Sequence, residues 1–294
     1  MPANAKDDVS IPDWPTGERT RYCAVGGYRL AFVEAGTRLP ALLLVHGSIS
    51  DYRSFQAQVS PLSAHARTIA VSLRHSYPER WDGRGDDFSV ERHADDLGEF
   101  IAAQGLGPVH LLGHSRGGAV VLELALRRPA CVRTLLLADP GGLEALLPDT
   151  PEGRTMARQT LAMFARLRTN LAEKDAETAA REFVEDLNGP GAWERRTAEQ
   201  RQVLLDNVRT GPACAQRPTF TPAQIASLAV PVLAITGAGS PPRYRPMFDA
   251  MRRLNPNVSP LVTIDGAGHA MHRDRPAAFN AAVIAFLAEH APAS

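Results

Sequence analysis

Short runs of consecutive apolar residues alternate along the chain with longer segments in which apolar residues recur at helical spacing. The runs are typical of strands buried on both faces of a parallel sheet. They comprise residues 41–45, 68–71, 109–112, 134–138, 232–236 and 261–264. Ahead of them, residues 22–25 and 28–33, joined by two glycines, predict a hairpin. The helical segments comprise residues 53–63, 90–104, 118–128, 243–254 and 277–289. This alternation predicts an α/β fold with a mostly parallel sheet covered by helices on both faces.

One segment, residues 143–217, departs from the alternation. It carries helical patterns at 155–170, 176–187 and 198–208, and it contains no convincing strand. We therefore predict a helical cap over 143–217, inserted after the sixth strand, and a core formed by 19–142 and 218–294. An insertion at the carboxyl ends of the strands would roof a site there, although a plain packing extension of the core is the alternative. Residues 1–18, rich in proline, predict a flexible leader.

Composition excludes several classes of protein. The chain has 294 residues, which suits one large core carrying an insertion, and its 32 basic residues equal its 32 acidic ones. This balance gives no reason to expect a nucleic-acid partner. The amino-terminal segment is polar with no apolar stretch behind it, so we expect neither a secretory signal nor a membrane anchor, and a cytoplasmic protein. Three widely spaced cysteines predict neither a disulfide framework nor a metal site.

The most informative motif is Gly113-His114-Ser115-Arg116-Gly117, which joins an apolar strand directly to a helical pattern. A serine on such a tight turn has its hydroxyl pushed away from the backbone, so Ser115 is the predicted nucleophile. Its proton requires a base. His269 follows a strand and a glycine-rich loop and is the predicted base, while His272 is the alternative, expected as a partly exposed helix residue.

The oxyanion that forms when Ser115 attacks a carbonyl requires two preorganised donors. The backbone amide of Arg116 opens the next helix and is one candidate. The second is the amide of Ser48, in the loop after the strand at 42–45, with that of Ile49 as the alternative. The Arg116 side chain is expected either to form a salt bridge or to contact a substrate carboxylate.

Three motifs at strand ends resemble those of the α/β-hydrolase fold family. They are, in chain order, His46-Gly47-Ser48, Gly113-His114-Ser115-Arg116-Gly117-Gly118 and Gly266-Ala267-Gly268-His269. The resemblance implies an eight-stranded sheet, a triad in the order serine, acid and histidine, no metal and no organic cofactor. The tight turn that carries the nucleophile is called the elbow. A serine there argues against the family's epoxide hydrolases and haloalkane dehalogenases, which attack through a carboxylate.

The acid of the triad departs from the common family pattern. Many members carry it in the turn after the penultimate strand, which here reads Gly237-Ala238-Gly239-Ser240. Some members carry it at the end of the sixth strand, where this chain has Asp139. We assign Asp139 as the acid, and on this assignment Ser240→Ala is expected to be nearly silent. A turn-capping role for Asp139, with Asp265 or Asp249 as the acid, is the alternative.

The predicted function is hydrolysis of a small to medium carboxylic ester or lactone through an acyl-enzyme on Ser115. The same triad also serves carbon–carbon bond hydrolases, acyltransferases and haloperoxidase-like enzymes. A non-catalytic ligand-binding protein is a further alternative, whose best support is the missing acid after the penultimate strand. The expected partner is a small-molecule substrate, with no nucleic acid and no membrane. The sequence indicates no particular oligomeric state.

Two sets of side chains are candidates for the pocket. Arg74, His75, Tyr77 and Trp81 lie in one loop, and they either line the mouth of the pocket or pack beneath the cap. The other set lies in the predicted cap and forms either a pocket roof or the cap's own core. It comprises Met156, Met163, Phe164, Phe183 and Trp193.

Overall fold

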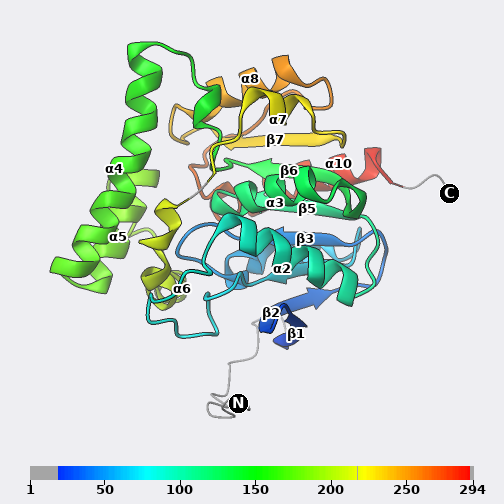
Figure 1. Ribbon diagram of the computed structural model, residues 1–294, viewed down its shortest axis with the longest axis horizontal. Helices are drawn as coiled ribbons and strands as arrows, with labels where there is room; N and C mark the ends of the chain where they lie inside the picture. The colour runs from blue at the N-terminus through cyan, green and yellow to red at the C-terminus, as the bar shows by residue number, and fades with distance from the viewer. Residues whose placement is uncertain (1–18, 217, 292–294) are drawn as a thin grey trace.

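A single eight-stranded sheet organises the protein in the computed structural model, which describes residues 19–216 and 218–291 (Figure 1). The strand order is β1-β2-β4-β3-β5-β6-β7-β8; β1, β2 and β4 pair antiparallel, and the pairs from β4 to β8 are parallel. The expected mostly parallel sheet is confirmed, whereas the leader expected over 1–18 lies outside the described residues. The strands are β1 (Arg21–Val25), β2 (Tyr28–Ala35), β3 (Leu42–Val45), β4 (Thr68–Val71), β5 (Val109–His114), β6 (Val132–Ala138), β7 (Val232–Gly237) and β8 (Val262–Ile264).

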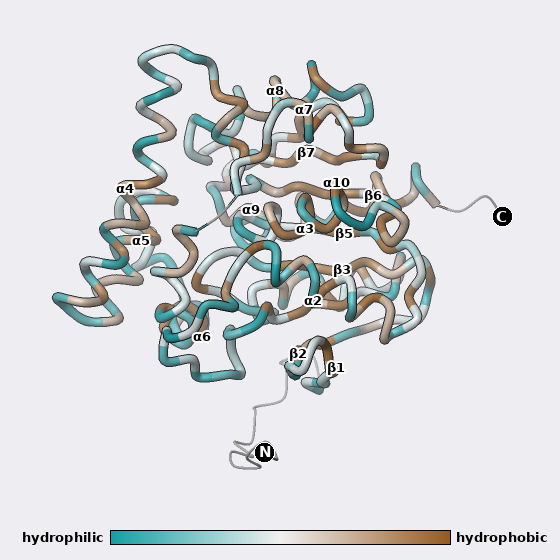
Figure 2. Tube along the Cα trace, viewed as in Figure 1, coloured by the Kyte–Doolittle hydropathy of each residue, from teal (hydrophilic) through white to brown (hydrophobic). Residues whose placement is uncertain are grey.

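Apolar runs become strands because successive side chains point to opposite faces of a sheet and both faces are covered. In β3, Leu43 and Val45 join the apolar cluster under α2, α3 and α8, whereas Leu42 and Leu44 join the cluster under α1 and α10. Figure 2 shows the hydrophobic residues concentrated along these strands. The helices of the two layers are α1 (Gln56–Leu62), α2 (Val90–Ala103), α3 (Arg116–Arg127), α7 (Pro222–Ala226), α8 (Tyr244–Leu254), α9 (Met271–Asp274) and α10 (Pro276–Glu289).

The helical insertion between β6 and β7 contains α4 (Pro151–Glu173), α5 (Ala176–Asn188) and α6 (Ala198–Asn207), which agrees with the three helical patterns predicted there. In Figure 1, α4 and α5 stand beyond one end of the sheet. The insertion has an apolar cluster of its own, which includes Phe164, Phe183 and Trp193 and reaches the core at Trp81 and Phe88. Of the helices described, none has both the length and the apolar composition needed to cross a membrane.

A polar junction fastens α6 to the core. The Nδ2 of Asn207 donates a hydrogen bond of 2.6 Å to the buried carboxylate of Asp51, and its Oδ1 accepts one of 2.8 Å from the backbone N–H of Tyr77. Beside them, Arg53 forms a salt bridge with Asp206, with 2.7 Å between nitrogen and oxygen. The loops after β3 and β4 therefore hold the insertion in a fixed position relative to the sheet edge.

Candidate active site

Ser115 lies in the sharp turn between β5 and α3, with backbone dihedrals of φ 53° and ψ −118°. A side chain rarely adopts such a positive φ, and strained residues of this kind concentrate at functional sites. The two flanking glycines make the turn possible. A Cβ on Gly113 would lie 2.6 Å from Gly118 Cα, and one on Gly117 would lie 2.1 Å from the carbonyl oxygen of Val45. The predicted elbow is therefore present, with its serine half-buried at the sheet edge.

Asp139 follows β6 and is fully buried. One oxygen accepts a hydrogen bond of 2.6 Å from Thr236 Oγ1. The other accepts one of 2.6 Å from Ser240 Oγ and one of 3.1 Å from His269 Nδ1. The structure thus brings together the two residues that the sequence analysis paired. It gives Ser240, which was expected to be nearly silent, a direct contact with the carboxylate.

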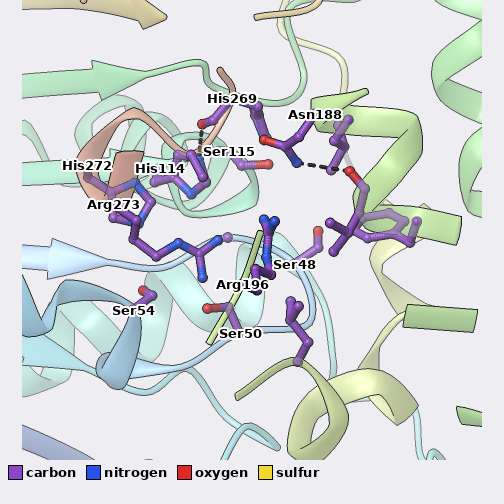
Figure 3. A pocket seen from close by; sticks show the side chains of 16 residues that line it. Ser48, Ser50, Ser54, His114, Ser115, Asn188, Arg196, His269, His272 and Arg273 are labelled. Atoms are coloured by element: carbon purple, nitrogen blue, oxygen red, sulfur yellow. Dashed lines mark hydrogen bonds between the residues drawn. The ribbon is translucent and has the colours of Figure 1, made fainter. Parts of the chain in front are cut away.

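His269 is fixed on several sides. Its backbone carbonyl accepts a hydrogen bond of 2.8 Å from His114 Nε2, and its ring stacks on Tyr244 with centroids 5.5 Å apart. With Nδ1 donating to Asp139, Nε2 is the basic nitrogen, and it makes no hydrogen bond within the described part of the chain. Ser115 and His269 line one cavity, as Figure 3 shows, although no hydrogen bond joins Ser115 Oγ to the imidazole.

Burial has the largest effect on the pKa values of Asp139 and His269. It raises the pKa of Asp139 to about 7, against the hydrogen bonds from Ser240 and Thr236, which lower it. Burial also lowers the pKa of His269 to about 3, and the positive charges of Arg243 and Arg273 lower it further. The imidazole is therefore neutral at neutral pH, which is the state in which Nε2 can accept a proton.

The loop after β3 lies against the nucleophile. A Cβ on Gly47 would approach Ser115 Cβ to 3.1 Å, and Ser48 lines the same cavity as Ser115. Next to it, Ile49 has a φ of 44°, which is unusual for a β-branched residue. His46 braces the loop: its Nδ1 donates to the carbonyl of Gly47, and its Nε2 accepts a hydrogen bond of 2.9 Å from the next loop. Ser48 and the start of α3 at Arg116 thus flank Ser115.

The side chain of Arg116 points away from this cavity. Its guanidinium lies over the ring of Phe88, 4.6 Å from the ring centroid, and a nitrogen lies 3.4 Å from His93 Nδ1. Arg116 is not among the residues that line the cavity shared by Ser115 and His269. The expected contact between this side chain and a substrate carboxylate has no support from this placement.

His272 was expected to be partly exposed, and this prediction is wrong. Its ring is fully buried between Phe55 and Phe279, with centroids 5.2 Å and 6.0 Å away. Neither ring nitrogen has a hydrogen-bond partner in the described residues, and burial lowers the pKa well below its usual value. A neutral, packed imidazole results. Asp265, the alternative acid, is exposed in the turn after β8.

The loop of Arg74, His75, Tyr77 and Trp81 packs instead of lining the cavity around Ser115. Arg74 forms a salt bridge with buried Asp96, with 2.8 Å between nitrogen and oxygen. His75 stacks on Trp81 with ring centroids 4.6 Å apart, and Tyr77 lies under the Arg53 guanidinium. None of the four belongs to either cavity that Ser115 lines in the described structure.

Two cavities meet at Ser115, and their linings differ. One is lined by His114, His269, His272 and two arginines that the sequence analysis missed, Arg196 of the insertion and Arg273 of α9. The other has a mixed lining, in which Glu144 and Arg243 stand beside apolar side chains. Its lining includes Met163, Phe164, Phe183, Leu187, Tyr244 and Met247.

Phe183 lines both cavities, whereas Trp193 lies 1% exposed in the insertion's own core and Met156 is half-buried. The apolar residues of the insertion thus divide between pocket and core.

Comparisons with known proteins show the family to which the chain belongs. A family model described as "Alpha/beta hydrolase family" matches residues 42–282. The chain is similar to the sn-1-specific diacylglycerol lipase ABHD11 of Mus musculus, with 28% identity over 87% of this chain and 83% of the relative. It is also similar to carboxylesterase YbfK of Bacillus subtilis (strain 168), with 23% identity over 95% of this chain and 91% of the relative. A solved esterase of Thermogutta terrifontis, with malate bound, has a TM-score of 0.72 and 26% identity over 93% of this chain and 98% of its own. The matched span contains Ser115, Asp139 and His269.

Proposed function

The chain is a hydrolase of the alpha/beta hydrolase family, and we propose that it cleaves a carboxylic ester or lactone through an acyl-enzyme on Ser115. The observation that carries the proposal is the hydrogen bond of 3.1 Å from His269 Nδ1 to Asp139, beside a serine in a strained elbow. Relatives named as a lipase, a carboxylesterase and an esterase support the ester class.

In the proposed acylation, Ser115 Oγ attacks the carbonyl carbon while its proton passes to His269 Nε2. The negative charge moves to the carbonyl oxygen, where the backbone amides of Ser48 and Arg116 donate hydrogen bonds to it. In its ionised form, Asp139 stabilises the imidazolium through Nδ1–H. The tetrahedral intermediate then collapses, and the leaving alkoxide takes the proton from Nε2.

Deacylation repeats the sequence with water. His269 Nε2 removes a proton from the water, whose oxygen attacks the acyl carbon, and the same two amides hold the second oxyanion. When the carbon–oxygen bond to Ser115 breaks, the serine oxygen takes the proton from His269 and the carboxylic acid leaves. The neutral resting state of His269 serves both half-reactions, because each begins with proton transfer to Nε2.

We infer that the segment 143–217 acts as a cap over this site. Phe183 and Leu187 of α5 line both cavities that Ser115 lines, so the insertion forms part of the wall around the scissile bond. A wall of this kind excludes water and shapes the substrate. The same placement argues against a plain packing extension.

The pairing of Asp139 with His269 also bears on the non-catalytic alternative. That alternative drew its support from a missing acid after the penultimate strand, where Ser240 stands. Ser240 instead donates to Asp139, so the acid position is occupied from β6. A complete donor and acceptor series from Asp139 to His269 favours catalysis over ligand binding alone.

The test combines labelling and turnover. Purified protein is treated with a fluorescent fluorophosphonate and assayed on esters, lactones and thioesters of graded size. We expect labelling and ester or lactone hydrolysis in the wild type, loss of both in Ser115→Ala, and retention of both in Ser60→Ala, which changes an exposed serine. A wild-type protein that is neither labelled nor active on any of these substrates contradicts the proposal, and so does labelling that persists in Ser115→Ala.

A further inference from the structure

Two arginines in the cavity beside Ser115 lack the carboxylate partners that Arg53 and Arg74 have. Arg74 is paired with Asp96, and Arg53 is paired with Asp51. Arg196 and Arg273, by contrast, form no salt bridge among the described residues. Both side chains are half-buried, and a positive charge partly removed from water is costly unless a partner of opposite charge compensates it. This cavity therefore holds positive charge that the fold itself leaves uncompensated.

The two side chains reach the cavity from opposite walls. Arg196 follows α5 in the insertion, and Arg273 belongs to α9 of the core. Figure 3 shows both extending into the space next to Ser115. Arg196 makes one hydrogen bond, from Nη1 to the carbonyl of Ala192 at 2.7 Å, and its buried Nε has no partner in the described chain. The remaining guanidinium N–H groups are available to a ligand in the cavity.

The positive charge of Arg273 is also close enough to affect the pKa of Arg196. Burial, and after it the charge of Arg273, lowers the pKa of Arg196 to about 9, and burial lowers the pKa of Arg273. Asp274 and Asp51 partly offset this effect for Arg273. Asp51 is already bonded to Arg53 and Asn207, however, and Asp274 to a backbone N–H. An anion placed between the two guanidinium groups would relieve the repulsion.

We propose that Arg196 and Arg273 bind a carboxylate group of the substrate, so that the enzyme prefers esters with an anionic end. A planar carboxylate matches the paired N–H groups of a guanidinium. This inference rests on the proposed ester hydrolysis and names its substrate class.

The activity test uses matched substrates. Monoethyl esters of succinate, glutarate and adipate place a carboxylate on the acyl side, and acyloxy-alkanoates place it on the alcohol side. Each is compared with a neutral analogue of the same length. We expect kcat/KM for the anionic member to exceed that of the neutral one by about tenfold to hundredfold on at least one side, which is the effect of one charged hydrogen bond. Equal values on both sides would overturn the inference and leave the proposed function intact.

Variants assign the preference to the two residues. Arg196→Gln and Arg273→Gln should each reduce the ratio of anionic to neutral kcat/KM, chiefly through KM, and the double variant should bring it close to one. Arg196→Lys keeps the charge without the planar donor pair and should retain part of the ratio. Arg195→Gln is the matched control, since the exposed Arg195 does not line the cavity. An unchanged ratio in the double variant refutes the assignment.

A binding measurement separates this inference from the proposed chemistry. Calorimetry on Ser115→Ala protein with monoethyl adipate needs no turnover. We expect binding that is lost when Arg196→Gln and Arg273→Gln are added, with circular dichroism confirming that this triple variant is folded. Binding that survives in the folded triple variant contradicts the anion site even if ester hydrolysis is established. Absence of any binding to Ser115→Ala protein contradicts it as well.

Discussion

The two walls of the catalytic cavity are held in different ways. At the sheet edge, Asp139 accepts hydrogen bonds from three side chains, and the ring of His269 stacks on Tyr244. On the opposite wall, Arg196 makes a single hydrogen bond, to a backbone carbonyl of its own segment. The groups proposed to carry the chemistry are thus fixed by many contacts, whereas the group proposed to bind the substrate has few. Selectivity can therefore change at the second wall without disturbing the first.

The largest expected effect concerns Asp139 at the sheet edge. Asp139→Asn should lower kcat by about 10³ to 10⁴ with the fold intact, as for triad aspartates in other serine enzymes. The amide cannot stabilise the imidazolium as a carboxylate does. Steady-state kinetics measure the effect, and circular dichroism checks the fold. Asp265→Asn is the control, because that side chain is exposed. Near-normal turnover in the Asp139 variant, or a comparable loss in the control, would give the acid role to another carboxylate.

The next largest effect concerns the junction that attaches the insertion to the core. Asn207→Ala removes the donor to Asp51 and the acceptor for the Tyr77 amide, both at the junction with the core. We expect the free energy of unfolding in urea to fall by about 2 to 3 kcal/mol, because buried polar groups lose their partners. Asp206→Asn alters a partly exposed salt bridge and should cost about 0.5 kcal/mol. Equal losses in the two variants would refute the buried junction as the main attachment.

Lowering the pH should destabilise the core more than the insertion at residues 143–217. His46, His93, His114 and His272 are buried in the core with lowered pKa values, about 4 for His46, whereas residues 143–217 contain no histidine. Below pH 6.5 the unfolded chain takes up protons that the folded core does not, so stability present above pH 6.5 is lost as the pH falls. At pH 5 the loss is about 2 kcal/mol for His46 alone.

Asp139 opposes this trend. Its raised pKa means that the folded state binds a proton between pH 7 and 4 before the unfolded chain does, which offsets about one histidine. Hydrogen exchange at pH 7 and pH 5 measures the balance. We expect protection to decrease in the strands of the core more than in α4 and α5. Uniform protection at both pH values would contradict the difference between the regions.

The smallest expected effect concerns Ser240. Its hydroxyl donates to the Asp139 carboxylate at 2.6 Å, so Ser240→Ala should raise the pKa of Asp139 further and lower kcat by about tenfold. The acid limb of the pH–rate profile should move to higher pH. Ser227→Ala, which changes an exposed serine, should leave both unchanged. A profile that does not move in Ser240→Ala would return this residue to the silent role expected from the sequence.

Features fixed by neighbouring residues could be predicted from the sequence. The strands follow from short apolar runs, because both faces of the sheet are covered. The elbow follows from Gly113 and Gly117, which flank the serine where any Cβ would clash. Asp139 could be placed because it ends an apolar strand at the same edge as the elbow.

Features that arise from distant segments were missed. His272 is buried because Phe55 and Phe279 pack on it from elsewhere in the chain, and neither lies within its own short helix. Arg196 and Arg273 line one cavity although they come from the insertion and from α9 of the core. Isolated arginines in polar sequence look like solvated surface residues, so no local signal marked them. The contact of the Ser240 hydroxyl was also missed, because its partner, Asp139, follows a different strand.

The attachment of the acid to β6 has a practical consequence for protein engineering. In this chain the loop from β7 to α8 carries no member of the proposed triad, yet it leads to Tyr244 and Met247 in the wall of the second cavity at Ser115. With Ser240 and Arg243 retained, redesign can replace Met247 while the carboxylate stays anchored on its own strand. Substrate scope and turnover thereby become separately adjustable traits.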